Sequence, residues 1–189
     1  MNAILDTRTR HLLTVDALEV LYREGILAPD ERVELIEGEI FDMPPSGPPH
    51  NGLVNAITKL LVRAAGDDAI VQCQGTVRLG DRSLVMPDFA LLRPGPDYNA
   101  ALPGPADVLL LIEVADSSAS FDRNTKAQLY ARHGVGEYWL IDINRRTVER
   151  YSEASEAGYR VRHEAYPGDR ISPLAWPSLL IEVSSLLPA

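Results

Sequence analysis

The stretch LLLIEVAD, residues 109–116, places a glutamate near the end of an apolar run. The segment Asp107 to Val114 predicts a strand with little alternation of polar and apolar side chains, which is typical of a central strand covered on both faces of its sheet. Burying an unpaired carboxylate is costly, so such a group is normally paired, protonated or bound to a metal ion. The state of Glu113 is therefore the first clue to function.

The bulk composition indicates a soluble protein. The 189 residues fit one globular domain covering residues 1–189. The single cysteine, Cys73, excludes an internal disulfide and favours a reducing cytoplasm. Residues 1–16 contain no uninterrupted apolar core of the signal-peptide type, and the longest apolar run, Val108 to Ile112, is too short to cross a bilayer. We therefore expect a cytoplasmic protein with no membrane partner.

The charge balance limits the kinds of nucleic-acid protein that the chain could be. The formal net charge is −9, with 18 Lys and Arg against 27 Asp and Glu. Proteins that coat DNA non-specifically carry a basic footprint, which this chain lacks overall. A metal-dependent nuclease stays possible, because a carboxylate site and a local arginine cluster can coexist on an acidic protein. The arginines that could contact phosphate form a loose group: Arg78, Arg82, Arg93, Arg123 and Arg132.

Hydrophobic periodicity and turn residues predict a chain of alternating helices and strands. Three helices are expected: one after a Thr14 cap to Glu24, one from Asn51 to Ala65, and one at 123–133 capped by Ser120 or Asp122. Strands are expected in the segments 32–43 (two strands), 70–79, 83–92, 107–114, 136–143, 147–152, 159–164 and 178–183. This order predicts an α/β or α+β fold, a mixed sheet flanked by helices with extra strands towards the N- and C-termini.

A second carboxylate, Asp88 in VMPDFALL, lies in another strand that the sequence predicts to be buried. Side chains two residues apart share one face of a strand, so Asp88 and Glu113 can face the same point if their strands are neighbours. Two adjacent ionised carboxylates repel each other unless a divalent cation lies between them. Oxygen ligands suit Mg²⁺ or Mn²⁺. The alternative is that each carboxylate is hydrogen-bonded or ion-paired within the protein.

Lys126 lies in the next predicted helix, on one stripe with Asp122 and Tyr130. A cation near the attacking water could orient it or stabilise charge that develops on a phosphate. Alternatively, Lys126 forms an i, i+4 pair with Asp122. His50 is either a loop or cap residue or a catalytic base. The ordered set Asp, Glu, Lys across strand, strand and helix favours a catalytic site.

With these residues the sequence resembles the PD-(D/E)XK, or restriction-endonuclease-like, superfamily, and within it the bacterial Uma-two family of restriction endonucleases. The matching segments, within about Thr14 to Tyr151, are ELIEGEIFDMPPSGPPH, MPDFALL, LLLIEVADSS, DRNTKAQLY and GVGEYWLID. The resemblance implies a mixed sheet flanked by helices, with Asp88 and Glu113 as ligands of Mg²⁺ or Mn²⁺. It also implies the backbone carbonyl of Val114 as a further ligand.

One position departs from the superfamily motif. The motif has a lysine two residues after the glutamate, where this chain has Ala115. In the resembling family the lysine appears in the following helix, which makes Lys126 its counterpart here. The resemblance also implies accessory roles for Glu34 and His50.

Three hypotheses about function follow. The first is a Mg²⁺-dependent endonuclease that cuts DNA by in-line attack of a metal-activated water. The second is a non-catalytic binding or interaction protein that retains the nuclease fold. The third, a His-Asn nuclease at His50-Asn51, lacks the additional metal-binding histidines that such a site needs. Cutting both strands of a duplex takes two sites, and the chain holds one, so we expect a homodimer.

Overall fold

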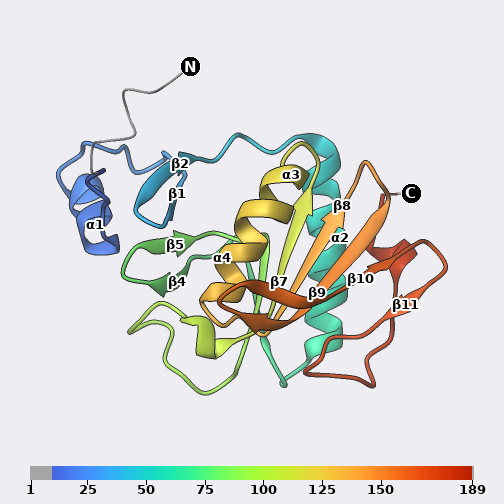
Figure 1. The fold of residues 1–189 in the computed structure, drawn as a ribbon. Coiled ribbons are helices and arrows are strands. Elements are labelled where there is room, and N and C mark those ends of the chain that lie inside the picture. Colours follow the sequence, from blue (N-terminus) through green and yellow to red (C-terminus); the bar gives the residue numbers. More distant parts are fainter. Residues whose placement is uncertain (1–9, 189) are drawn as a thin grey trace.

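The computed structural model describes residues 10–188 of the chain. Its largest element is a six-stranded sheet with the strand order β10-β9-β8-β7-β6-β3 (Figure 1). The apolar run that carries Glu113 is β7 (Val108–Ala115), which is parallel to β8 (Glu137–Asp142) and antiparallel to β6 (Phe89–Leu92). The sheet is therefore mixed, as the sequence predicts, and β7 lies in its interior.

The remaining elements follow one another in the order that alternating helices and strands predict. They are α1 (Val15–Arg23), β1 (Val33–Ile36), β2 (Glu39–Asp42), α2 (Pro48–Ala65), β3 (Ile70–Cys73), β4 (Val77–Gly80), β5 (Ser83–Val85), η1 (Pro105–Asp107), α3 (Ala119–Phe121), η2 (Asp122–Lys126), α4 (Ala127–Arg132), β9 (Thr147–Ser155), β10 (Gly158–Ala165), β11 (Arg170–Ile171), β12 (Ile181–Glu182) and η3 (Val183–Leu186).

Helices cover both faces of β7, which explains its nearly continuous apolar sequence (Figure 1). Ile112 belongs to a hydrophobic cluster that α2 completes with Ile57. Leu111 belongs to a second cluster, which α4 completes with Tyr130. Because side chains alternate along a strand, Glu113 points to the same face as Leu111, towards α4. The predicted burial of this strand on both faces is confirmed.

The N-terminal strands form a sheet of their own, with the order β2-β1-β5-β4. β1 is antiparallel to both β2 and β5. Helix α1, which begins after the predicted Thr14 cap, packs against this sheet through Val15 and Leu18 on Leu35. The sheet matters for function because β1 carries Glu34.

The sequence predicts unbroken strands over 70–79 and 83–92, and both predictions are wrong at one point. The chain leaves the six-stranded sheet after β3 to form β4 of the smaller sheet, and it returns after β5 to form β6. Gln74 has a φ of 49°, and Pro87 has no N–H for a strand ladder, so neither residue continues a strand. The Gln74 N–H donates to the carbonyl of Asp88 at 2.9 Å. Asp88 therefore lies in a crossing between the sheets, just before β6.

The start of the third helix also differs from the prediction. Ser120 and Asp122 do not cap it, because the helix begins at Ala119 and both residues lie inside it. The five residues of η2 are π-helical, and α4 then continues to Arg132. A π-helical turn is a rare, wider turn within an α-helix that is frequently found at functional sites.

Smaller differences affect the ends of other elements. Helix α2 begins at Pro48 rather than Asn51, because proline is well suited to the first helical positions. Of the strand predicted over 178–183, only the two residues of β12 pair, with β11. None of the helices described is long and apolar enough to cross a membrane. Residues 1–9, part of the segment for which we predict no signal peptide, lie outside the described residues.

The turn between β1 and β2 gives a test of the fold. Gly38 has a φ of 88°, and a Cβ added there would lie 2.6 Å from the Cβ of Leu12. Gly52 lies in α2, where an added Cβ meets nothing within 4 Å. We expect Gly38→Ala to lower the free energy of unfolding by about 1–3 kcal/mol and Gly52→Ala to raise it by up to about 1 kcal/mol. Urea denaturation measures the free energy of unfolding of both variants. Equal values for the two would contradict the turn conformation described at Gly38.

Candidate active site

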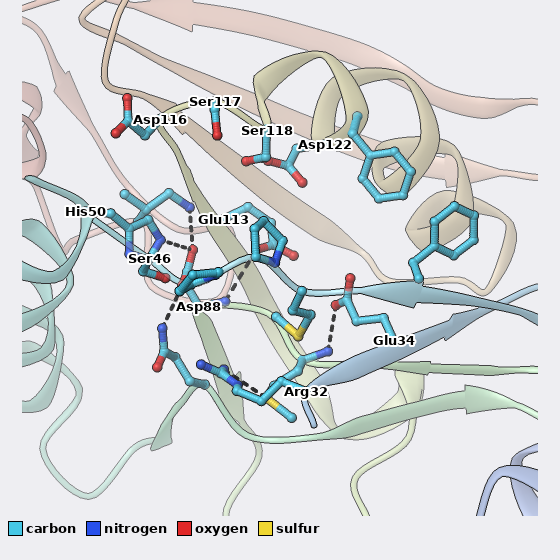
Figure 2. A pocket seen from close by; sticks show the side chains of 18 of the residues that line it. Arg32, Glu34, Ser46, His50, Asp88, Glu113, Asp116, Ser117, Ser118 and Asp122 are labelled. Carbon is cyan, nitrogen blue, oxygen red and sulfur yellow. Dashed lines mark hydrogen bonds and ion pairs between the residues drawn. The ribbon is translucent and has the colours of Figure 1, made fainter. Parts of the chain in front are cut away.

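Asp88 lies at the crossing between the sheets, beside the end of β7 (Figure 2). Its Oδ2 accepts a hydrogen bond from the Val114 N–H at 2.9 Å, and its Oδ1 accepts one from the side-chain amide of Gln74 at 3.2 Å. Oδ2 also lies 3.1 Å from Nε2 of His50. Burial alone raises the pKa of Asp88, but its hydrogen bond and charge interaction with His50, together with the other two donors, outweigh burial and lower that pKa. Asp88 is therefore ionised at neutral pH.

His50 lies in the first turn of α2 and is nearly buried. The hydrogen bond with Asp88 raises the pKa of His50, against the opposing effect of burial. Its Nδ1 has no hydrogen-bond partner among the described residues. The structure thus places His50 against Asp88, where the imidazole orients the carboxylate.

Glu113 meets Asp88 from the neighbouring strand. Its Oε1 accepts hydrogen bonds from the ammonium of Lys126 at 3.0 Å and from the hydroxyl of Tyr130 at 2.6 Å. Its Oε2 lies 3.4 Å from the backbone N–H of Asp88. The antiparallel register of β6 and β7, in which Phe89 faces Ile112, brings the two carboxylates to one end of the sheet. The predicted convergence of Asp88 and Glu113 is confirmed.

Lys126 reaches the site from the π-helical turn. Its ammonium lies 2.9 Å from the nearer oxygen of Glu34 and 3.0 Å from Glu113, whereas Asp122 is 4.0 Å away. The lysine is only 5% exposed. The i, i+4 pair with Asp122 is therefore only the longest contact of Lys126, and its two closer partners come from two different sheets.

Burial and the neighbouring charges shift the pKa values of Glu113 and Lys126. Burial raises the pKa of Glu113 to about 8; the ammonium of Lys126 opposes this effect, and the charges of Asp122, Asp88 and Glu34 add to it. Burial lowers the pKa of Lys126, but the charges of Glu113, Glu34 and Asp122 outweigh burial and raise that pKa above its ordinary value. Lys126 is thus firmly protonated, whereas its ammonium does not stabilise the ionised form of Glu113 enough to overcome burial.

These side chains line one cavity of about 400 Å³. Its walls include the loop after β2, the crossing at Asp88 and the segment between β7 and η2 (Figure 2). The permanent cations in its lining are Arg32 and Lys126. The carboxylates in its lining are more numerous: Glu34, Asp42, Asp88, Glu113, Asp116 and Asp122. The cavity is therefore strongly acidic.

The donor set fits a hard divalent cation. Within residues 10–188, no three or more His, Cys, Asp or Glu side chains form a ready-made metal-binding group. Asp88 and Glu113 do offer two converging carboxylates, and among the described residues Oε2 of Glu113 has no hydrogen-bond partner closer than the 3.4 Å contact to the backbone nitrogen of Asp88. Mg²⁺ commonly takes one or two carboxylates and fills its remaining positions with water. The residues present therefore fit Mg²⁺ or Mn²⁺.

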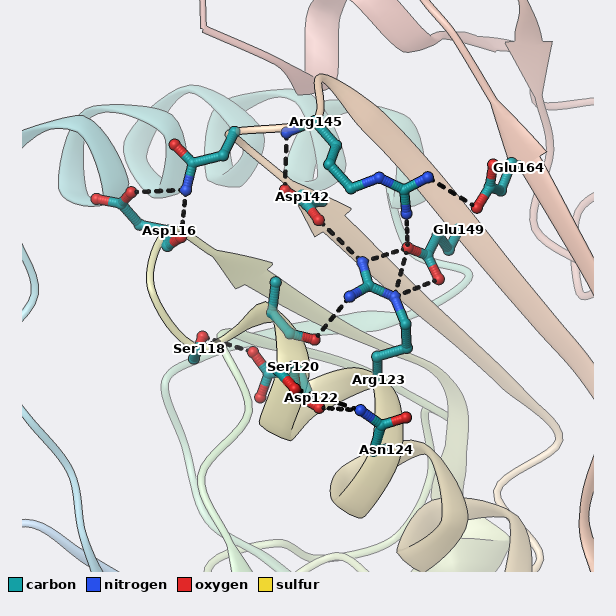
Figure 3. A network of polar contacts seen from close by, with 12 residues as sticks. Asp116, Ser118, Ser120, Asp122, Arg123, Asn124, Asp142, Arg145, Glu149 and Glu164 are labelled. Carbon is teal, nitrogen blue, oxygen red and sulfur yellow. Dashed lines mark hydrogen bonds and ion pairs between the residues drawn. The ribbon is translucent and has the colours of Figure 1, made fainter.

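Arg123, which is not part of the cavity lining, ties the π-helical turn to the large sheet (Figure 3). Its Nε and Nη2 donate to both carboxylate oxygens of Glu149 at 2.5–3.2 Å, and Nη2 also donates to Asp142 at 2.9 Å. Both acids are buried. This anchor lets the turn present Asp122 and Lys126 to the cavity.

The arginines that the sequence suggests as phosphate contacts do not form a cluster at this cavity. None of the five is in its lining. Arg123 is bound to buried acids, Arg78 pairs with Asp16, and Arg132 pairs with Glu37. The carboxylate partners of these three arginines come from distant parts of the chain, so the sequence pattern alone does not reveal them.

Sequence reasoning also missed some residues of the site. Tyr130 was placed on the stripe of Lys126, but its hydrogen bond to Glu113 was not foreseen. Gln74 was assigned to the middle of a strand. Arg32 was overlooked, although it lies two residues before Glu34, a spacing that puts both on one side of an extended segment.

The fold of this chain is similar to that of a solved structure described as a "putative nuclease belonging to DUF820" from Anabaena variabilis ATCC 29413. The TM-score is 0.72 at 17% sequence identity, covering 92% of this chain and 97% of that one. At this identity the likeness shows a shared fold, which is restriction-endonuclease-like. The chain itself belongs to the Uma2 family: the model of that family, described as "Putative restriction endonuclease", matches residues 16–185.

A second solved structure, that of the type IIG restriction endonuclease BpuSI, is similar over 58% of this chain and 12% of that one. Its TM-score is 0.38 at 17% identity, so the likeness is only partial. Comparison with curated proteins gives no match.

The two lysines of the chain give a matched test of the buried ion pairs. Lys126→Met leaves Glu34 and Glu113 without their shared ammonium, and breaking a buried pair costs about 3–5 kcal/mol. Lys59 is exposed on α2, so Lys59→Met should change the free energy of unfolding by no more than about 0.5 kcal/mol. Urea denaturation measures both variants. If Lys126→Met proved as stable as Lys59→Met, the charge arrangement described above would be wrong.

Proposed function

We propose that this protein is a Mg²⁺-dependent endonuclease, with Mn²⁺ as an alternative ion, that hydrolyses phosphodiester bonds in DNA by attack of an activated water. The observation that carries the proposal is the convergence of Asp88, Glu113 and Lys126 in one acidic cavity. Membership of the Uma2 family supports a nuclease.

Each residue has a distinct role in this proposal. Asp88, Glu113 and the backbone carbonyl of Val114 hold the ion. When bound, the ion supplies Lewis acidity towards the phosphate and the attacking water. Lys126 orients Glu113 through its 3.0 Å contact and places a positive charge where negative charge develops on the phosphate.

Two accessory residues fix the ligands in place. His50 holds Asp88 through the contact between Nε2 and Oδ2. Glu34 forms an ion pair with the ammonium of Lys126 and also accepts a hydrogen bond from the backbone N–H of Met86 at 2.8 Å. Both residues therefore position the reacting groups without binding the ion.

The alternative is a non-catalytic binding protein that retains the nuclease fold. The net charge of −9 favours it, because a polyanion gains little from such a surface. The site argues for catalysis, because a protein that only binds has no need to bury three carboxylates around one lysine. The His-Asn hypothesis has no support: Nε2 of His50 faces Asp88, and no histidine cluster exists within residues 10–188.

Assembly and location are further parts of the proposal. Cleavage of both strands of a duplex calls for two such sites, and each chain supplies one, so we propose a homodimer. The single cysteine is consistent with a cytoplasmic location.

A cleavage assay separates catalysis from binding. We expect the wild type to cut plasmid or single-stranded DNA with Mg²⁺ or Mn²⁺ and not with EDTA. Asp88→Asn weakens the hold on the ion and should lower the rate by about a hundredfold or more. Asp67→Asn, which removes the same charge from an exposed position, should cut like the wild type.

The result that would contradict the proposal is specific. Wild-type protein that leaves duplex and single-stranded DNA intact with both ions would favour the non-catalytic alternative. Equal rates for Asp88→Asn and Asp67→Asn would show that any cleavage takes place elsewhere.

A further inference from the structure

Arg32 is a cation of the cavity for which the nuclease mechanism above has no use. It lies just before β1, on the same side of the segment as Glu34, and its side chain is exposed at the cavity (Figure 2). Its Nη2 lies 3.1 Å from Sδ of Met86, which is a weak acceptor. Among the described residues it forms no ion pair with a carboxylate. Most of its N–H donors are therefore free to meet a ligand.

The other cations near the site are already engaged. Lys126 is shared between Glu34 and Glu113. Arg123 is bound to Glu149 and is not part of the cavity lining. A ligand that entered the cavity would therefore find Arg32 as the available permanent cation.

The backbone holds Arg32 in a defined position. The N–H of Met43 donates to its carbonyl at 2.9 Å, which ties the segment to the loop after β2. The backbone N–H of Met86 donates to Glu34, so that the thioether next to the guanidinium belongs to a residue fixed by the site itself. The backbone of Arg32 is thus held in the wall of the cavity, two residues before the buried Glu34, and the exposed guanidinium extends from there.

The charge of the cavity explains why such a cation is needed. Six carboxylates and two permanent cations line the cavity, so a phosphate group is repelled unless positive charge is added. A divalent ion between Asp88 and Glu113 neutralises only part of the excess negative charge. A guanidinium presents a planar fork of N–H donors that matches two phosphate oxygens, and this geometry binds a phosphate more strongly than a single point charge does.

We propose that Arg32 forms a phosphate-binding subsite in the wall of this cavity, which takes a phosphodiester group of the nucleic-acid substrate beside the Asp88–Glu113 pair. This subsite rests on the proposed nuclease function and specifies how an acidic protein holds a polyanion. The guanidinium contacts the substrate equally before and during the reaction, so it contributes to substrate binding and leaves the chemical step to the buried groups. Its loss therefore raises KM and leaves kcat nearly unchanged.

Three variants test the subsite. Arg32→Met removes the charge and keeps an unbranched side chain, Arg32→Lys keeps the charge without the fork, and Arg63→Met removes the same charge from an exposed position on α2. The probe for binding is a short fluorescent single-stranded oligodeoxynucleotide with Mg²⁺, followed by anisotropy at several salt concentrations before cleavage proceeds. Kinetics of cleavage of the same oligonucleotide give KM and kcat, and melting temperatures report whether each variant folds.

We expect Arg32→Met to weaken binding and raise KM by about tenfold or more, with kcat within about twofold of the wild type. The slope of log affinity against log salt should fall by about 0.7, the contribution of one phosphate contact on a single strand. Arg32→Lys should recover part of the affinity, and Arg63→Met should match the wild type.

The possible results distinguish failure of the proposed subsite from failure of the proposed nuclease function. If the wild type binds the oligonucleotide without cleaving it, and Arg32→Met loses this binding, the subsite is supported and the proposed catalysis is overturned. Cleavage and binding that are the same in Arg32→Met and Arg63→Met overturn the subsite and leave the nuclease standing. A folded wild type that binds no oligonucleotide overturns the subsite as well.

Discussion

The ammonium of Lys126, held between Glu34 and Glu113, is the contact on which the rest of the site depends. Glu34 comes from the four-stranded sheet, Glu113 from the six-stranded sheet and Lys126 from the π-helical turn, so a single cation joins three parts of the fold. The same cation makes it possible to bury both glutamates. It does not overcome the effect of burial on Glu113, whose pKa stays raised, and Glu113 faces the cavity together with Asp88.

Another buried glutamate, Glu149, shows how the fold compensates a buried carboxylate with several cations. Glu149 is fully buried and accepts ion pairs from three arginines, Arg123, Arg145 and Arg162. Glu113 is buried to a similar degree and has one shared ammonium and one tyrosine hydroxyl. The fold can therefore supply ample positive charge to a carboxylate whose role is structural. Glu113 has less positive charge nearby and lies beside the ionised carboxylate of Asp88, which is the arrangement that a bound cation would stabilise.

Much of this arrangement could be predicted from local patterns. The continuous apolar run of β7 predicted a strand covered on both faces, and the placement of Asp88 and Glu113 predicted that they meet. What failed depends on long-range structure. The exchange of strands between two sheets interrupts segments whose side-chain period looks unbroken. A π-helical turn differs from an α-helix by one residue per turn, which periodicity over so short a segment does not resolve. The pairing of Arg123 with Glu149 depends on a strand far along the chain, so the sequence left that arginine apparently free.

The central claim is that Asp88 and Glu113 converge in order to hold a divalent cation, and direct binding of Mn²⁺ tests it without reference to catalysis. Electron paramagnetic resonance of free Mn²⁺ gives affinity and stoichiometry for the wild type, for Glu113→Gln and for Glu19→Gln, which removes a charge from the exposed face of α1. The account predicts one site per chain in the wild type and in Glu19→Gln, and a loss of affinity of about tenfold or more in Glu113→Gln. Equal binding by all three proteins would contradict it.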